Sequence, residues 1–288
     1  MPVVHHRTIR IEGLDVFYRE AGPANAPVIV LLHGYPTSSH MFRHLMPALA
    51  DRYRVIAPDH IGFGRSSAPS VGEFHYTFDE LARITRAFLD AVDVKRFTVY
   101  THDYGAPIAW RLALGEPSSV DGVISQNGNA YEEGFVADFW APIWAYGRNP
   151  SPENEAALRP AMERQAVEWQ YLHGVPDPTL VDPDAWEHDL ALLGRPGNDL
   201  AQLALFGDYH TNRALYPEFQ EWLRTSGVPV LAIWGANDEI FGPAGAEAFR
   251  NDAPHARIEL FDGGHFLLES HLDDAVGVIR EWRGSFSA

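Results

Sequence analysis

Short apolar runs alternate with helical patterns along most of this 288-residue chain, and this alternation constrains its fold more than any other feature. Gly, Pro or Asp residues bound the runs, which is typical of buried strands. Runs that are apolar on both faces predict a mostly parallel, twisted sheet flanked by helices, an α/β fold. The predicted strands are Val28–Leu32, Arg54–Ala57, Phe97–Thr101, Gly122–Ser125, Val230–Trp234 and Ile258–Phe261.

Local patterns predict how this sheet begins and how one of its helices is capped. The segments Arg7–Ile11 and Leu14–Arg19 flank Glu12-Gly13 and predict an antiparallel hairpin at the sheet edge. A helix is predicted over residues 77–92, because apolar residues recur there at helical spacing. Thr77 and Glu80 form a capping-box pattern at its start.

The alternation stops between about Asn127 and Glu218, and this segment is rich in Trp, Tyr, Pro and acidic residues. Four of its tryptophans are too many for a solvated linker: Trp140, Trp144, Trp169 and Trp186. We therefore predict a helical cap over residues 128–217, packed on the carboxyl edge of the sheet. The α/β core is then formed by residues 1–127 and 218–288.

Composition excludes several kinds of function. The formal net charge of −17 would repel phosphate groups and anionic lipids, so neither nucleic acid nor a membrane is an expected partner. The chain has no cysteine, so a covalent nucleophile must be an oxygen or a nitrogen. Neither a metal nor a cofactor is expected. The N-terminal residues have no signal-peptide pattern, which favours the cytoplasm. A homodimer is compatible with the sequence.

Asp103 is the candidate nucleophile. The segment Phe97–Thr101 continues through His102 into a tight turn and then into a helix of small residues, 106–114. This strand, turn and helix is the context that exposes a catalytic nucleophile, and here the central position holds Asp103 in place of Ser. A carboxylate attacks a saturated carbon and forms an alkyl ester. The competing interpretation is that Asp103 only caps the following helix.

Two later loops contain groups that could complete a catalytic triad with Asp103. Asp238 follows the strand Val230–Trp234, and His265 follows the strand Ile258–Phe261. The loops after parallel strands meet at one sheet edge, so the three side chains are expected to lie together. His265 would activate water, and Asp238 would orient its imidazole. Taken alone, a loop histidine such as His265 is more often a surface residue than a base, so the prediction depends on the joint pattern.

Two backbone amides are candidates for an oxyanion hole. Gly34 allows a sharp turn after the strand Val28–Leu32, so that the N–H of Tyr35 can point at a developing oxyanion. The N–H of Tyr104, directly after the nucleophile, is the expected second donor. The alternative for the first element is an ordinary Gly-Pro turn.

These motifs resemble those of α/β-hydrolase-fold enzymes of the epoxide hydrolase and haloalkane dehalogenase group, over nearly the whole chain. The resemblance rests on His33-Gly34-Tyr35-Pro36, Asp59-His60-Ile61-Gly62-Phe63-Gly64-Arg65-Ser66, His102-Asp103-Tyr104-Gly105, Asp238 and Gly264-His265. It implies a helical cap and an Asp-alkyl ester that is hydrolysed by a His-activated water. Both branches of the group share this chemistry.

The two branches differ in how they stabilise the leaving group. Dehalogenases of the group typically hold halide with a Trp directly after the nucleophile and with an Asn or second Trp, and this chain has Tyr104 and Tyr35 at the corresponding places. Epoxide hydrolases use cap tyrosines, and the segment around Tyr209 resembles the cap segment that carries one. For its partner the candidates are Tyr171 and Trp169. Tyr131 is a weaker substrate-binding candidate.

The resemblance therefore implies opening of a neutral, apolar epoxide to a vicinal diol, with a small molecule as the partner. A haloalkane or haloacid dehalogenase with the same triad is the alternative. Fluoroacetate dehalogenases of the group carry an Arg after the nucleophile, whereas this chain has Tyr104, which disfavours a carboxylate substrate. A cofactor-free oxidase and a non-catalytic small-molecule receptor are known variations on the same fold and remain further alternatives.

Overall fold

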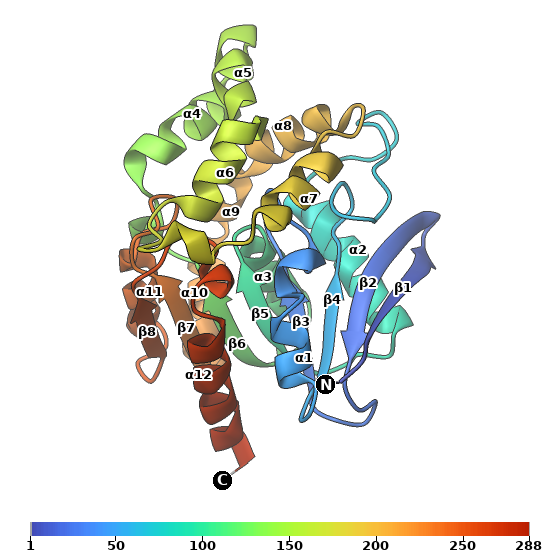
Figure 1. Ribbon diagram of the computed structural model, residues 1–288, viewed down its shortest axis with the longest axis vertical. Coiled ribbons are helices and arrows are strands. Elements are labelled where there is room, and N and C mark those ends of the chain that lie inside the picture. Colours follow the sequence, from blue (N-terminus) through green and yellow to red (C-terminus); the bar gives the residue numbers. More distant parts are fainter. Residues whose placement is uncertain (1, 288) are drawn as a thin grey trace.

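The apolar runs form an eight-stranded sheet in the computed structural model, which describes residues 2–287 (Figure 1). The strand order is β1-β2-β4-β3-β5-β6-β7-β8. β1 and β2 form the antiparallel hairpin at one edge, β2 is antiparallel to β4, and the other neighbours are parallel. The strands are β1 (Val4–Ile11), β2 (Leu14–Ala21), β3 (Val28–Leu32), β4 (Arg54–Pro58), β5 (Phe97–His102), β6 (Val120–Gln126), β7 (Val230–Gly235) and β8 (Arg257–Phe261).

Burial of the central strands explains their sequences. Every residue of β5 and of β7 is buried, because helices cover both faces of the sheet at these strands. β8 lies at the far edge and its residues are only partly buried or exposed. The predicted α/β architecture with a mostly parallel sheet is confirmed.

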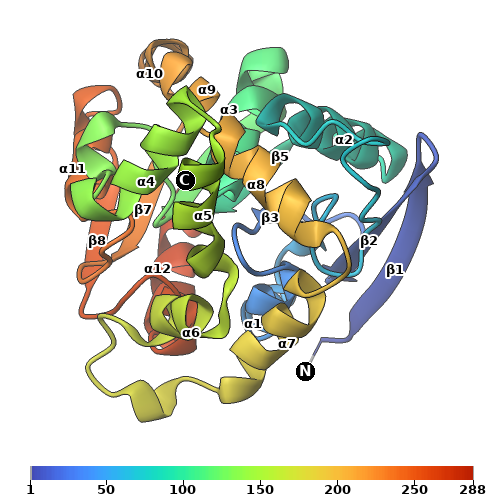
Figure 2. The same ribbon diagram turned by 90° about the horizontal axis from the view of Figure 1, so that it is seen from above.

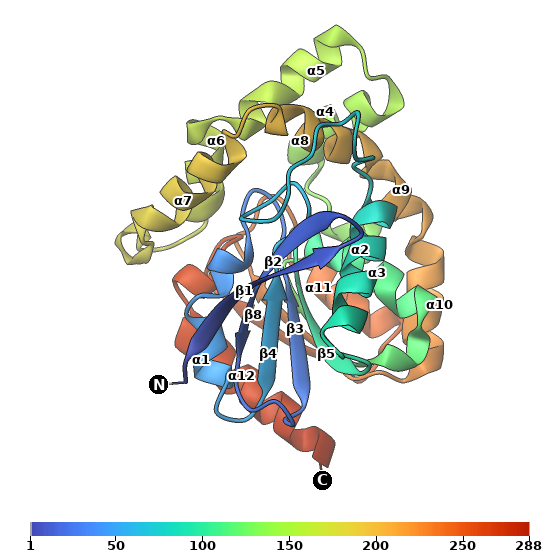
Figure 3. The same cartoon turned by 90° about the vertical axis from the view of Figure 1, so that its right-hand side faces the viewer.

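Two groups of helices cover the faces of the sheet (Figure 3). α1 and α12 lie on one face, and α2, α3 and α10 lie on the other. The helices of both faces are α1 (Leu45–Leu49), α2 (Phe78–Ala91), α3 (Gly105–Gly115), α10 (Tyr216–Ser226), α11 (Ala244–Ala248) and α12 (Leu272–Gly284). α2 begins as its capping pattern predicts, because the Thr77 side chain accepts the N–H of Glu80 at 3.2 Å.

A third group of helices connects β6 to β7 and lies above the sheet (Figures 1 and 2). These overlying helices are α4 (Ala137–Arg148), α5 (Pro152–Leu158), α6 (Arg164–Leu172), α7 (Pro183–Leu193) and α8 (Asn198–Asp208), and α9 (His210–Ala214) leads back to the core. They contact the loops that follow the strands: Tyr35 donates its hydroxyl to Ala161 O at 2.9 Å, and Trp140 donates its indole N–H to Ile240 O at 2.8 Å. Within residues 2–287, no helix has the length and apolar character that crossing a membrane would need.

Candidate active site

Asp103 occupies the turn between β5 and α3. Its φ of 48° is in the left-handed region, which Asp adopts more readily than most residues. Two glycines make this turn possible. A Cβ on Gly105 would lie 2.1 Å from Leu32 O, and a Cβ on Gly34 would lie 2.2 Å from Asp103 Oδ1. The turn therefore holds the carboxylate at the carboxyl edge of the sheet, directly against the loop after β3.

Backbone amides hold the Asp103 carboxylate in place. Oδ1 accepts the N–H of Tyr35 at 2.6 Å. Burial raises the pKa of Asp103 to about 6, although the His265 charge and the N–H groups of Tyr35 and Tyr104 favour the carboxylate. The side chain is therefore a desolvated carboxylate near neutral pH, and the same amides would face the carbonyl oxygen of an ester formed on Asp103.

His265 and Asp238 lie together at the same edge of the sheet. Nδ1 of His265 donates to Asp238 Oδ2 at 2.8 Å, and both side chains are buried. Burial opposes protonation of His265, but the Asp238 carboxylate, its hydrogen bond and the Asp103 charge outweigh this effect and raise the pKa of His265. Nε2 is buried and hydrogen bonds to no described residue. The geometry thus orients the imidazole with a free Nε2, as a base that acts on water requires.

Asn127 supports this pair, and the sequence reasoning missed it. Its amide donates to Asp238 Oδ2 at 2.7 Å, while its oxygen accepts the N–H of Gly235 at 3.0 Å. The other carboxylate oxygen of Asp238 accepts the N–H of Ile240 at 2.7 Å. Asn127 directly follows β6, as Asp103 follows β5, so its place after a buried parallel strand was the available signal.

The backbone of His265 is also fixed by neighbouring strands. Its carbonyl oxygen accepts from His102 Nε2 and from Gln126 Nε2, each at 3.2 Å. His102 packs its ring 4.5 Å from the His265 ring, between centroids. Two side chains from β5 and β6 therefore determine where the His265 loop lies relative to Asp103.

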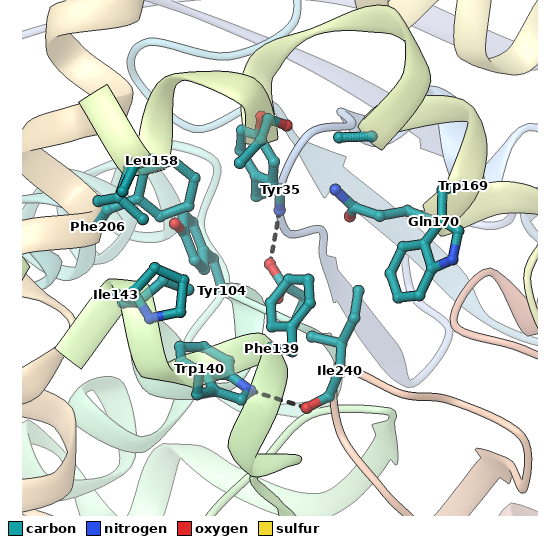
Figure 4. Close-up of a pocket in the computed structure, with 15 residues that line it drawn as sticks. Tyr35, Tyr104, Phe139, Trp140, Ile143, Leu158, Trp169, Gln170, Phe206 and Ile240 are labelled. Atoms are coloured by element: carbon teal, nitrogen blue, oxygen red, sulfur yellow. Dashed lines mark hydrogen bonds between the residues drawn. The ribbon is translucent and has the colours of Figure 1, made fainter. Parts of the chain in front are cut away.

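A cavity of about 200 Å³ opens onto Asp103 between the sheet edge and the overlying helices (Figure 4). Asp103 is the one charged residue among those that line it. The lining residues are Tyr35, Asp103, Tyr104, Phe139, Trp140, Pro142, Ile143, Ala157, Leu158, Ala161, Ala166, Trp169, Gln170, Phe206 and Ile240. The cavity is smaller than the roughly 300–1,000 Å³ that is usual for ligand pockets, so its size and its mostly apolar lining suit a small apolar substrate.

Of the four aromatic residues that the sequence offered as candidates in the helical segment, only one lines the cavity. Trp169 lines the cavity. Tyr209 is buried beside it, with its ring 4.5 Å from that of Trp140 and 5.8 Å from that of Tyr104, and it is not among the lining residues. Burial raises the pKa of Tyr209 well above its usual value, which makes it a weaker acid.

Tyr171 and Tyr131 also lie outside the cavity lining. The Tyr171 hydroxyl donates to Asp189 Oδ2 at 2.6 Å, and its ring stacks 3.8 Å from Phe266. Tyr131 packs edge to face on Phe249, at 5.2 Å between ring centroids. Gln170, which the sequence reasoning did not consider, lines the cavity in their place. It is adjacent to Trp169, so the sequence had pointed to this helix and to one of its lining residues.

Together these groups support nucleophilic attack by a carboxylate followed by hydrolysis. The cavity contains Asp103 as nucleophile, the Tyr35 N–H binds its Oδ1, and Asp238 orients the imidazole of His265 at the same sheet edge. In residues 2–287, no group of three or more His, Asp or Glu side chains is arranged to hold a metal ion.

Comparisons with known proteins agree with this arrangement. The family described as alpha/beta hydrolase fold matches residues 27–272. The chain is 47% identical to an uncharacterized hydrolase of Saccharomyces cerevisiae, over 91% of this chain and 90% of that protein. It is 30% identical to a haloalkane dehalogenase of Mesorhizobium japonicum, over 92% and 86% of the two chains. It is 23% identical to epoxide hydrolase 2 of Caenorhabditis elegans, over 96% and 79%.

Proposed function

The chain belongs to the α/β-hydrolase fold family, and we propose that this hydrolase opens a neutral epoxide to a vicinal diol through an ester on Asp103. The carboxylate nucleophile supports this proposal, because it attacks a saturated carbon, whereas a serine in its place would attack a carbonyl. The cavity supports a neutral substrate, since no lining residue has a positive charge that could pair with a substrate carboxylate.

In the proposed first step, Asp103 attacks a ring carbon of the epoxide. Because Oδ1 is held by the Tyr35 N–H, Oδ2 is the oxygen that forms the new bond. The carbon–oxygen bond of the ring breaks and its electron pair passes to the epoxide oxygen. Water supplies the proton that converts this alkoxide to a hydroxyl group, and hydroxide leaves the site.

In the second step, His265 removes a proton from a water molecule through Nε2. The resulting hydroxide attacks the carbonyl carbon of the Asp103 ester, and the negative charge develops on the oxygen that faces the Tyr35 and Tyr104 amides. Collapse of this intermediate expels the diol oxygen, which takes the proton from His265. Asp103 then loses one proton, which balances the hydroxide released in the first step.

The hydrogen bonds of the cavity aromatics are the observation that favours an epoxide. Tyr35 donates its hydroxyl to Ala161 O, and Trp140 donates its indole N–H to Ile240 O. The Tyr104 hydroxyl is buried away from the cavity space. A departing halide ion needs several donors that hold it as a free anion, and the Tyr35 and Trp140 protons are already used. An epoxide oxygen stays attached to the substrate, so its charge can be neutralised by a proton.

Haloalkane dehalogenation is the second candidate, and two observations favour it. Trp169 brings an indole ring to the cavity. The Mesorhizobium relative, itself a haloalkane dehalogenase, matches most of both chains. The triad geometry suits this reaction equally well, since the same carboxylate would displace the halide.

Turnover of a small substrate panel separates the two reactions. Styrene oxide and a terminal aliphatic epoxide are assayed for diol, and 1-bromobutane and fluoroacetate are assayed for released halide. Asp103→Asn serves as the blank. Diol without halide is the expected result. Halide without diol would assign the dehalogenase reaction, and no product from any substrate would exclude both.

The ester intermediate can be tested directly. His265→Gln removes the base of the second step, so the variant is expected to become alkylated on Asp103 and then to stall. A mass spectrum of the variant after exposure to a substrate of the wild type reports this adduct. An unmodified protein would contradict the assignment of His265 to the second step alone.

A further inference from the structure

Gln170 places an uncommitted amide in the cavity. The side chain extends from α6 into the cavity, and its amide is directed toward Tyr35 (Figure 4). The residue is only 4% exposed, no side-chain hydrogen bond within residues 2–287 involves its amide, and the surface it retains lines the cavity. A polar group that faces an apolar cavity without a protein partner is costly to leave unpaired, and a hydrogen bond to a ligand would satisfy it.

The other polar side chains at the cavity are committed or turned away. The hydroxyl proton of Tyr35 is used by Ala161 O, and the indole proton of Trp140 is used by Ile240 O. The Tyr104 hydroxyl also hydrogen bonds to no described residue, but it is fully buried and presents no surface to the cavity. The carboxylate of Asp103 is the nucleophile and accepts hydrogen bonds.

The ring of Trp169 lines the cavity, while its indole N–H points away from Tyr35. The indole stacks on His173, at 4.7 Å between ring centroids, and on Phe139 at 6.1 Å. Figure 4 shows its nitrogen on the side of the ring remote from Tyr35. Among the lining residues, the Gln170 amide is therefore the side-chain donor that faces the cavity without a protein partner.

We propose that Nε2 of Gln170 donates a hydrogen bond to the epoxide oxygen while Asp103 opens the ring. This inference rests on the proposed function and names the group that stabilises its first step. As Asp103 Oδ2 bonds to one ring carbon, the electron pair of the breaking carbon–oxygen bond moves to the oxygen that Gln170 holds. An amide does not release its proton, so water completes the protonation and Gln170 keeps both of its hydrogens.

The same geometry defines a substrate preference. Nε2 can hold a compact oxygen that lies close to the attacked carbon, and the apolar lining receives the rest of the molecule. The cavity of about 200 Å³ is small, so we expect terminal epoxides with one apolar substituent to be the substrates that use Gln170.

The test isolates the first step in a His265→Gln background, where the ester accumulates. Rapid-quench mass spectrometry follows alkylation of Asp103 by styrene oxide with and without Gln170→Met, which keeps the side-chain length and removes the N–H donors. Loss of one hydrogen bond to a developing charge is expected to slow alkylation by about 10- to 100-fold. Gln165→Met is the matched control, because Gln165 lies on the exposed face of the same helix.

Each outcome decides between the proposals. Slower alkylation with Gln170→Met and an unchanged rate with Gln165→Met support the role of Gln170. Equal rates in all three proteins, with diol formed by the wild type, overturn that role and leave epoxide hydrolysis standing. No diol from the wild type overturns both proposals. Circular dichroism and thermal unfolding confirm that each variant is folded before its rate is compared.

A second comparison separates Gln170 from Tyr209. Tyr209→Phe is measured in the same background, because the sequence resemblance points to this phenol as the group that stabilises the epoxide oxygen. If Tyr209→Phe slows alkylation and Gln170→Met does not, the phenol stabilises the epoxide oxygen and the proposal for Gln170 is wrong.

Discussion

The buried carboxylate of Asp103 makes the site reactive and also lowers the stability of the fold. Its ordinary pKa of 3.8 rises to about 6, chiefly because burial removes water from the charged form. In the unfolded chain this group ionises near pH 3.8, but in the folded protein it ionises only near pH 6. Folding is therefore penalised as the pH rises through this interval, and the penalty is complete above pH 6. A shift of about 2 units corresponds to about 3 kcal/mol.

Asp103→Asn is accordingly expected to stabilise the protein while abolishing turnover. The amide keeps an oxygen for the Tyr35 N–H and removes the buried charge. The gain in the free energy of unfolding should approach about 3 kcal/mol at pH 7 and vanish near pH 3.5. Urea unfolding of both proteins across this pH range measures it.

Asp93→Asn is the matched control for this measurement. Asp93 is exposed and has a φ of 55°, so its replacement repeats the chemical change and the backbone conformation without the burial. A gain of the same size in Asp93→Asn would assign the effect to the left-handed backbone, and a gain in Asp103→Asn that does not depend on pH would contradict the charge argument.

The sequence predicted some residues of the site better than others, and the reason is geometric. Asp103, Asp238 and His265 each follow a strand within a few residues, so the sheet brings them to one edge whatever the rest of the chain does. Gln170 and Tyr209 lie in or beside helices of the overlying group. If such a helix turned about its axis by one residue, a different side chain would face the cavity. Packing among several helices determines this orientation, so it cannot be predicted from a short sequence motif.

At the scale of elements, α8 and α2 are joined by one carboxylate. Asp208 at the end of α8 accepts the N–H of Phe78, the first residue of α2, at 2.8 Å. Burial raises the pKa of Asp208, while this hydrogen bond and the Arg111 charge oppose the rise. The bond satisfies a free donor at the α2 N-terminus, where negative charge is favourable. An overlying helix is thereby anchored to a helix of the core.

Asp208→Ala should lower the free energy of unfolding by about 1–2 kcal/mol, since it leaves the Phe78 N–H without its acceptor. Thermal or urea unfolding measures the change. Asp208→Asn retains an acceptor oxygen and should recover most of the loss. Unchanged stability in Asp208→Ala would mean that water replaces the carboxylate at no cost.

The strands were predicted to within a few residues, whereas the overlying helices were predicted only as a helical segment. Buried parallel strands have near-continuous apolar runs between turn residues, which fixes their place along the chain. The segment over residues 128–217 mixes aromatic, acidic and proline residues, and α4 even contains Pro142. Its helices are short and gain stability from one another, so their bounds depend on tertiary contacts.

At the scale of the whole molecule, the active-site cavity is a chamber between the sheet edge and the overlying helices. The sheet edge contributes Asp103, and the overlying helices contribute most of the apolar lining. Its volume of about 200 Å³ favours a small substrate. The two parts therefore have a division of roles: the sheet edge provides the reacting groups, and the overlying helices determine which substrates fit.

Leu158→Ala tests this division, because Leu158 of α5 lines the chamber and is buried. The larger space should raise kcat/KM for stilbene oxide relative to styrene oxide by about 10-fold, at a cost of about 2–5 kcal/mol in stability. Leu203→Ala is the control, since Leu203 is buried in α8 outside the lining. A similar change in preference in both variants would show that loosening, and not chamber size, alters selectivity.

The hydrogen bond between Tyr35 N–H and Asp103 Oδ1 makes the two carboxylate oxygens of Asp103 behave differently during turnover. In the proposed reaction, Oδ2 departs inside each diol and an atom from water replaces it, while Oδ1 stays in place. In water enriched with oxygen-18, the first diol from each enzyme molecule should carry an unlabelled atom from the protein. After many turnovers the Asp103 peptide should contain one heavy oxygen and never two, so a single atom of the active site persists for as long as the protein does.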